Sequence, residues 1–337
     1  MVEHDLQLTV SSSPHLRMPV TVSTAMRDVI IALLPVTLVS ILLFGLYALF
    51  LIAVCLSTAA LTEVLFRRIL NKPVTLHDGS ALVTGLLVAM LFAPATAWWT
   101  AALATFIGVG IAKELMGGLG WNRFNPALFG RLTVIMIYPL FYYVTEAFGL
   151  LRPYFGPIDA VTQGTPLAQM IQGVNLPPLN QLLIAYPGGS LSETSALAVF
   201  IGGVFLIVRK HITWHIPVAI IGTVAIMALI LGESPFYHIL AGGVMIGAFF
   251  MATDWVTSPI TLQGKFIFGI SIGVLLMLFR VPLAPTEGMA FSILIMNFFV
   301  PLIDLATKRP KFGEVKEKRF FSFLKPKPYS YGAQKQS

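Results

Sequence analysis

The chain is dominated by long apolar runs that are separated by short polar turns. Five runs precede and five follow a Gly- and Pro-rich stretch at 149–192. Runs of this kind are typical of helices in a bilayer, because a helix satisfies its backbone hydrogen bonds internally. The pattern predicts an all-α polytopic membrane protein with ten transmembrane segments, at 29–45, 46–66, 80–95, 98–116, 126–148, 193–208, 214–231, 236–252, 264–279 and 287–306.

The two halves of the chain have matching irregularities. The third and eighth runs are short and rich in glycine, and each half holds an odd number of runs, so the second half enters the membrane in the opposite sense. Interrupted segments at matching places are typical of inverted-repeat folds that build a site near the membrane midplane. We therefore expect an N-terminal arm, a five-helix repeat, a long loop, a second five-helix repeat and a basic tail, at 1–28, 29–148, 149–192, 193–306 and 307–337.

Composition and charge fix the class and the orientation. With 56% hydrophobic residues, 11% charged residues and a mean hydropathy of +0.83, the chain is outside the range of soluble domains. Placing both termini in the cytoplasm puts 20 of the 22 Lys and Arg residues on that side and leaves only Arg152 and Arg280 outside. The positive-inside rule then predicts a bacterial or archaeal inner-membrane protein whose 149–192 loop is extracytoplasmic. The basic tail indicates contact with membrane lipid rather than with nucleic acid.

The chain has few side chains of the kinds that bind metal ions or iron–sulfur clusters, and this limits its cofactor chemistry. Cys55 is the single cysteine, so the chain offers no disulfide, iron–sulfur or Cys-based zinc site. The histidines His211, His215 and His238 are scattered and predict no metal set. Any electrons that pass through this chain would travel on an organic cofactor.

Three polar turns are predicted on the inner side of the membrane. In the first, Asn122 and Asn125 lie between aromatic residues and glycines, and Asn125-Pro126 is also typical of a helix N-cap. A flavin ring needs a similar mixture of stacking faces and amide edges. Asp78 and Asp254 begin and end apolar runs on the same side. They are interpreted either as caps or as members of a shared ion- or proton-handling site.

The long loop carries the sequence Asp-Ala-Val-Thr-Gln-Gly-Thr-Pro-Leu-Ala at 159–168. On local chemistry alone, Thr165 is an N-cap and Pro166 begins a helix. The stretch also resembles the flavin-transferase acceptor motif Asp-x-x-Ser/Thr-Gly-Ala-Thr, whose last Thr is esterified to the phosphate of FMN. Asp159, Thr162 and Thr165 match the acid, hydroxyl and acceptor positions, while the motif's Gly and Ala are replaced by Gln and Gly at 163–164. Thr162 is the alternative acceptor.

Taken in order, these motifs resemble the family that contains the RnfD subunit of the Rnf electron-transport complex and its relative in the Na⁺-translocating NADH:quinone oxidoreductase. The resemblance implies ten helices in two inverted repeats and FMN bound covalently to Thr165 by a flavin transferase. It also implies a second, noncovalent flavin (riboflavin in some members), for which Asn122, Asn125 and Asp254 are the candidates. The chain would then be one subunit of an ion-translocating oxidoreductase that is not catalytically complete alone. Flavin- and iron–sulfur-bearing subunits would be its partners, and electron transfer between ferredoxin and NAD would be coupled to Na⁺ or H⁺.

Two other classes of protein fit the apolar pattern. An inverted-repeat channel or transporter for a small solute would have similar helices, as would an anchor subunit without a cofactor. Neither class explains why an acid and two hydroxyl residues, Asp159, Thr162 and Thr165, occur at this spacing.

Overall fold

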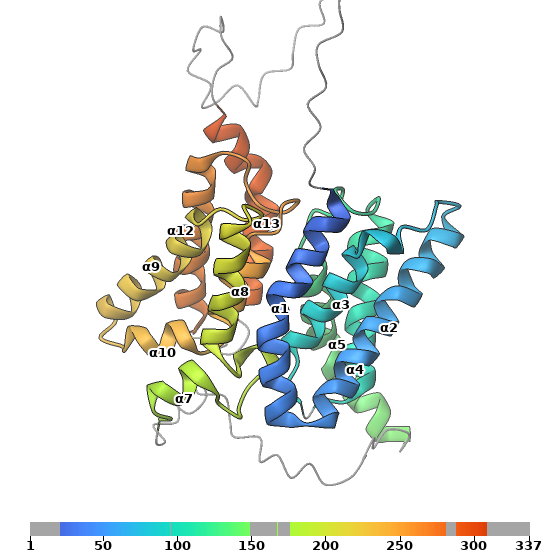
Figure 1. Cartoon of the computed structure of the whole chain (residues 1–337), viewed down its shortest axis with the longest axis horizontal. Coiled ribbons are helices and arrows are strands. Elements are labelled where there is room, and N and C mark those ends of the chain that lie inside the picture. Colours follow the sequence, from blue (N-terminus) through green and yellow to red (C-terminus); the bar gives the residue numbers. More distant parts are fainter. Residues whose placement is uncertain (1–20, 95, 149–166, 168–175, 281–287, 309–337) are drawn as a thin grey trace, which may run out of the picture.

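The computed structural model describes residues 21–94, 96–148, 167, 176–280 and 288–308. Over these residues the chain is helical and contains no β-strand, as the apolar pattern predicts. Figure 1 shows the helices before and after the long loop as two groups that lie side by side. The start of α1 and the end of α13 lie at the same end of the molecule, which is the upper end in Figure 1.

Every apolar run of the first half forms a helix. The elements are α1 (Val22–Phe44), α2 (Leu46–Ile69), η1 (Leu76–Asp78), α3 (Ser80–Leu91), α4 (Trp98–Phe106), η2 (Ile107–Leu115) and α5 (Pro126–Phe148). The first helix starts at Val22, before the predicted run, because Thr21 accepts a hydrogen bond from the Thr24 amide as its N-cap. The fourth run is one continuous helix that changes from α to π geometry at Ile107.

The second half is helical as well, but one of its runs is broken. Its elements are α7 (Leu179–Ile184), η3 (Leu191–Glu193), α8 (Ala196–Val208), α9 (His215–Ile230), α10 (Pro235–Leu240), α11 (Val244–Ile246), η4 (Gly247–Met251), α12 (Leu262–Arg280) and α13 (Gly288–Thr307). The break falls at Gly242 and Gly243, both at φ +68°, where a residue with a side chain would be strained. Arg280 stabilises it by donating to the carbonyls of Ala241 and Gly242 at 2.9 and 3.0 Å.

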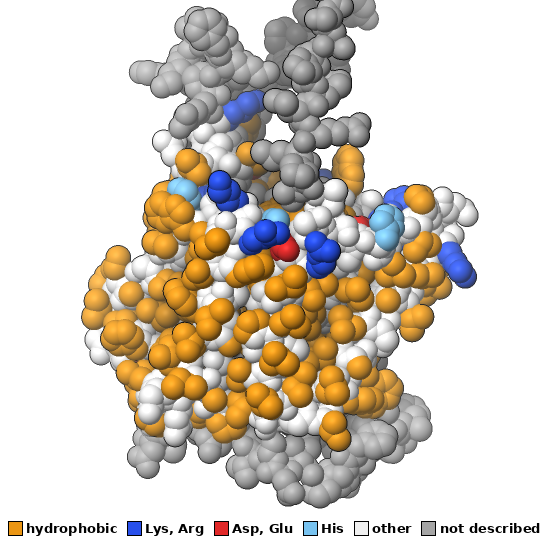
Figure 2. All heavy atoms as spheres, viewed as in Figure 1, with side chains coloured by type: hydrophobic (Ala, Val, Ile, Leu, Met, Phe, Trp, Pro, Cys, Tyr) orange, Lys and Arg blue, Asp and Glu red, His pale blue; other side chains and the backbone are white. Residues whose placement is uncertain are grey.

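The surface is that of a membrane protein. Four helices, α1, α2, α12 and α13, are long and apolar enough to cross a bilayer, and α3, α8 and α9 are shorter apolar helices. Large apolar side chains face outward along them, and Leu42 and Leu46 are 83% and 82% exposed. Figure 2 shows apolar side chains over most of this face and the Lys and Arg side chains gathered along one rim. The chain is therefore a multi-pass membrane protein.

Packing within the two halves follows a similar order. In the first half α2 packs on α3, α4 and η2, and α5 packs on α4 and η2. In the second half α9 packs on α10 and α12, and α13 packs on α12. Across the interface α1 lies against α8 and α5 contacts α13. A pocket at this interface is lined by residues of α3, α5 and η4.

Candidate functional site

A pocket lies between the two halves. Clefts between helices are frequent sites for small organic ligands. The first half lines the pocket with residues of α1, α3 and η2 and with the turn that leads into α5. The second half lines it with residues of α8 and η4 and of the segments that follow these two helices. The polar or aromatic lining residues are Ser80, Thr84, Lys113, Asn122, Asn125, His211, Phe249, Phe250, Thr253, Asp254 and Trp255. The pocket thus brings together Asn122, Asn125 and Asp254, the three residues predicted to hold a second flavin.

The two asparagines of the inner turn have different roles. Asn125 is the N-cap of α5, because its Oδ1 accepts from the amides of Ala127 and Leu128 at 3.0 and 3.3 Å. Its Nδ2 donates to the Met251 carbonyl of η4 at 3.2 Å, so the same side chain joins the two halves. Asn122 is also buried, but its Oδ1 has no hydrogen-bond partner among the described residues. Asn122 is therefore the better of the two for contacting a ligand.

Asp254 contributes an acid to the pocket wall just after η4. Its Oδ2 accepts from the Thr257 hydroxyl at 3.0 Å. Burial raises the pKa of the Asp254 carboxyl, while hydrogen bonds from Thr257, Asn122 and two backbone amides oppose the rise. A partly desolvated carboxyl at the edge of a cavity can hold a proton or a cation.

Asp78 does not share this site. Its Oδ1 accepts from the amide and the hydroxyl of Ser80 at 2.7 and 2.5 Å, which fixes the turn that begins α3. Asp78 does not line the pocket, whereas Ser80 does. Of the two interpretations of Asp78 and Asp254, the structure supports the helix-start role for Asp78 and a pocket position for Asp254.

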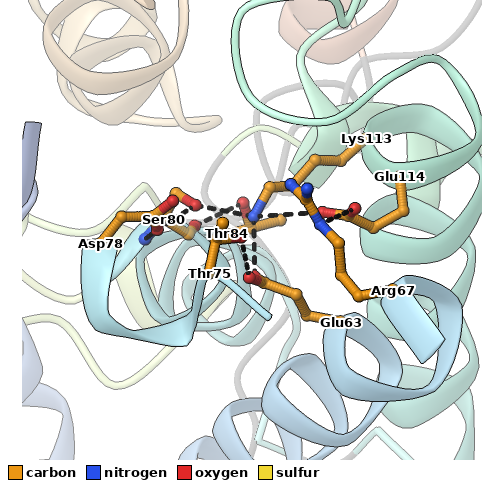
Figure 3. Close-up of polar contacts among 8 residues, drawn as sticks. All are labelled: Glu63, Arg67, Thr75, Asp78, Ser80, Thr84, Lys113 and Glu114. Carbon is orange, nitrogen blue, oxygen red and sulfur yellow. Dashed lines mark hydrogen bonds and ion pairs between the residues drawn. The ribbon is translucent and has the colours of Figure 1, made fainter. Parts of the chain in front are cut away.

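A buried charge network adjoins the pocket, and the sequence motifs did not predict it. Figure 3 shows Glu63 and Arg67 of α2 facing Lys113 and Glu114 of η2. Lys113 Nζ lies 2.9 Å from Glu63 Oε2, and Arg67 Nε lies 2.6 Å from Glu114 Oε2. All four side chains are buried. A signal was present in the sequence, since ionisable residues inside apolar runs are functional candidates by default.

Asp28, another buried acid, pairs with two residues of the other half. Asp28 of α1 accepts from Arg209 Nε at 3.0 Å and lies 2.6 Å from His211 Nε2. The backbone carbonyl of His211 in turn accepts from the Trp255 indole at 2.6 Å. Because His211 and Trp255 both line the pocket, this contact ties α1 and the segment after α8 to the pocket wall.

A second, smaller cavity also lies between the halves. Ala127 and Phe250 line the pocket, and their neighbours Leu128 and Met251 line the second cavity. The polar lining of the second cavity is Arg131, Ser190, Ser192 and Glu193. Two cavities therefore lie along the interface of the halves.

The predicted flavin-acceptor residues lie outside the described residues. This applies to Asp159, Thr162 and Thr165. Leu167, two positions after Thr165, is described and is 2% exposed. It lies beside Gly242 at the break between α10 and α11.

Replacing Asn125 is expected to loosen the interface. Asn125→Ala removes a helix cap and the bond to Met251, so we expect a loss of about 1–2 kcal/mol in unfolding free energy. Asn125→Asp keeps the capping oxygens and loses only the donor, so it should lose less. Thermal unfolding in detergent measures both. Equal loss in the two variants would show that the cap contributes nothing.

The fold and the site define a polytopic membrane protein with a largely apolar pocket, bearing a few polar groups, between two helical halves. Comparison with known proteins gives the family: the model of the NQR2, RnfD, RnfE family matches residues 9–313. The chain belongs to this family. The match confirms the expected kind of protein, one subunit of a multi-subunit oxidoreductase, and favours it over a channel or transporter for a small solute.

Three relatives illustrate the similarity. The D subunit of the Na⁺-translocating ferredoxin:NAD⁺ oxidoreductase complex of Acetobacterium woodii is 40% identical, over 94% of this chain and 98% of the relative. The D subunit of the proton-translocating ferredoxin:NAD⁺ oxidoreductase complex of Clostridium ljungdahlii is 39% identical, over 90% and 96%. The D subunit of an ion-translocating oxidoreductase complex of Marinobacter nauticus is 37% identical, over 93% and 98%.

Proposed function

We propose that this chain is the membrane electron-carrier subunit of an ion-translocating ferredoxin:NAD oxidoreductase complex. In this proposal it carries FMN on Thr165 and holds a second flavin, noncovalently, in the pocket between its halves. The observation that carries the proposal is the convergence of Asn122, Asn125 and Asp254 on one pocket in a chain of this family. Flavin- and iron–sulfur-bearing subunits would be its partners, and a flavin transferase would load the FMN.

The pocket residues fit a flavin ring. Phe249, Phe250 and Trp255 supply aromatic faces, and the unpartnered Oδ1 of Asn122 supplies a buried acceptor for a ring N–H. A flavin bound there would accept and release electrons singly or in pairs. The chain's own part is to bind the ring between the halves, to exclude water from it and to present Asn122 and Asp254 to its polar edge.

Attachment of FMN to Thr165 rests on the motif in the long loop. The acceptor must be a hydroxyl with small neighbours, and Gly164 keeps the preceding position small. Leu167, which follows the motif, is buried beside Gly242. With Thr165 on the extracytoplasmic side and the pocket near the basic rim, the two flavins would serve opposite sides of the membrane.

The proposal includes coupling of electron transfer to movement of Na⁺ or H⁺. We propose ten crossings in two inverted repeats, supported by the repeated packing order of the helices, with both termini in the cytoplasm. The two cavities along the interface of the halves supply polar groups that an ion could contact in turn. Moving one monovalent cation against 100 mV costs about 2.3 kcal/mol, which a modest redox drop supplies. The Na⁺- and H⁺-translocating relatives are equally similar to this chain, at 40% and 39% identity.

Substitution of Asn122 tests the pocket assignment. In Asn122→Ala the ring loses one hydrogen bond of about 1–1.5 kcal/mol, so noncovalent flavin should bind about tenfold more weakly. The covalent FMN should be unchanged, and Asn180→Ala, at an exposed site in α7, should change neither. Acid extraction of the purified complex followed by chromatography measures noncovalent flavin per chain. Full retention in Asn122→Ala would place the second flavin elsewhere.

A further inference from the structure

The pocket wall contains a buried lysine that has no part in the proposed function so far. Lys113 is 2% exposed and lies in η2, the π-helical part of the fourth run. π-Helical turns are rare and often occur at functional sites, because they change the direction of one side chain within a helix. Figure 3 shows the Lys113 ammonium meeting Glu63 of α2 and Ser80 at the start of α3.

Its contacts hold the ammonium without saturating it. Lys113 Nζ donates to Glu63 Oε2 at 2.9 Å and to the Ser80 hydroxyl at 2.7 Å. Glu114 Oε1 lies farther away, at 3.7 Å. An ammonium has three N–H donors, so one more acceptor can be accommodated. Since Lys113 and Ser80 both line the pocket, a ligand there can supply that acceptor.

Each carboxylate of the network is engaged by a separate partner. Glu63 receives the Thr75 hydroxyl on Oε1 at 2.6 Å and Lys113 on Oε2. Glu114 is paired with Arg67. Two acids and two bases make the network neutral in total, and a neutral ion-paired network is often no more stabilising than apolar packing. Stability alone therefore does not account for a lysine at the pocket wall.

The charges that face the pocket are few. Among its described lining residues the titratable side chains are Lys113, Asp254 and His211. Lys113 is thus the one Lys or Arg side chain in this set. In a site shielded from water, a fixed cation strongly favours a ligand state that carries additional negative charge.

We propose that Lys113 raises the reduction potential of the flavin held in this pocket, and that Glu63 moderates the effect by holding the ammonium. The inference rests on the proposed function. Two electrons and one proton add one net negative charge to the ring, and Lys113 stabilises that charge while keeping its own proton. Lys113 is a positioning residue that tunes the potential and takes no part in the electron transfer itself. The electrons come from an external reductant, such as dithionite in the titration below.

The test is a redox titration of the noncovalent flavin in the purified complex, with flavin content measured for each variant. The double variant Glu63→Gln/Lys113→Gln removes both charges and keeps the network neutral. We expect it to lower the preference of the pocket for reduced over oxidised flavin at least tenfold, which is about 30 mV for a two-electron couple. Glu63→Gln alone should shift the potential upward, because it leaves the cation without its strongest partner. Lys113→Arg should keep the potential near that of the original chain.

The outcomes distinguish failure of the tuning role of Lys113 from failure of the proposed function. If the original complex holds no noncovalent flavin, the proposed function fails. If that flavin is present and its potential is the same in Glu63→Gln and in the double variant, the tuning role of Lys113 is wrong. Should the double variant not assemble, Glu63→Gln and Lys113→Arg decide the matter, because both retain a cation at position 113. An upward shift in the first and no shift in the second support the inference, and any other pair of results overturns it.

Discussion

Thr165→Val is expected to yield a chain without covalent FMN. Valine has nearly the shape of threonine but no hydroxyl, so no phosphoester can form at that position. The chain should lose its ultraviolet fluorescence in a denaturing gel, and its intact mass should fall by one FMN. Electron transfer through the complex should fall to background, because the outer carrier is missing.

Two companion substitutions make the result specific. Thr165→Ser keeps a hydroxyl and should remain flavinylated, and Thr162→Val should leave the FMN in place. If Thr165→Val remains fluorescent while Thr162→Val does not, the acceptor is Thr162. If the original chain, produced together with the flavin transferase, carries no FMN, then the changes at Gln163 and Gly164 prevent recognition of the motif.

Glu114→Gln is expected to destabilise the fold by about 3–5 kcal/mol, which is typical of removing one partner from a buried ion pair. Glu114 is fully buried, and its oxygens make no hydrogen bond of good geometry among the described residues. It is held by the charges of Arg67 at 2.6 Å and Lys113 at 3.7 Å. Neutralising it leaves two cations facing the single acid Glu63 in a site that water does not reach.

The measurement is unfolding of the purified chain in detergent, by heat or by denaturant. Glu233→Gln is the matched control, because Glu233 is exposed after α9 and its substitution should change the unfolding free energy by no more than about 0.5 kcal/mol. A Glu114→Gln variant as stable as this control would mean that Arg67 and Lys113 are compensated in another way. The tuning role of Lys113 would then have to be judged from the redox titration alone.

Under the proposed function, electron transfer and ion movement would share the interface that holds the pocket. Lys113 joins the charge network to the pocket wall, and Asp254 lies on the opposite half. A change of charge in the pocket therefore acts on groups of both halves at short range. Coupling through a pre-existing two-state interface requires such a difference in contacts between redox states.

The sequence determined the helices and several local features by itself. Apolar runs that exceed the hydrophobic content of soluble domains can form little else than membrane helices, and each predicted run is helical in the described part of the chain. The interruption of the eighth run at Gly242 and Gly243 and the cap formed by Asn125 before Pro126 are local as well, since they depend on backbone freedom and on near neighbours.

Only the tertiary structure decided which polar groups meet. Glu63 and Lys113 are 50 positions apart, and Asp28 and His211 are 183 apart. Whether such residues face each other depends on how each helix is rotated about its axis and on which helices are neighbours. An evenly apolar run contains little information on its rotation, because lipid and protein core favour the same side chains. The packing of α2 on η2 and of α1 on α8 supplied that information, and with it the charge network, the pocket and the separate roles of Asn122 and Asn125.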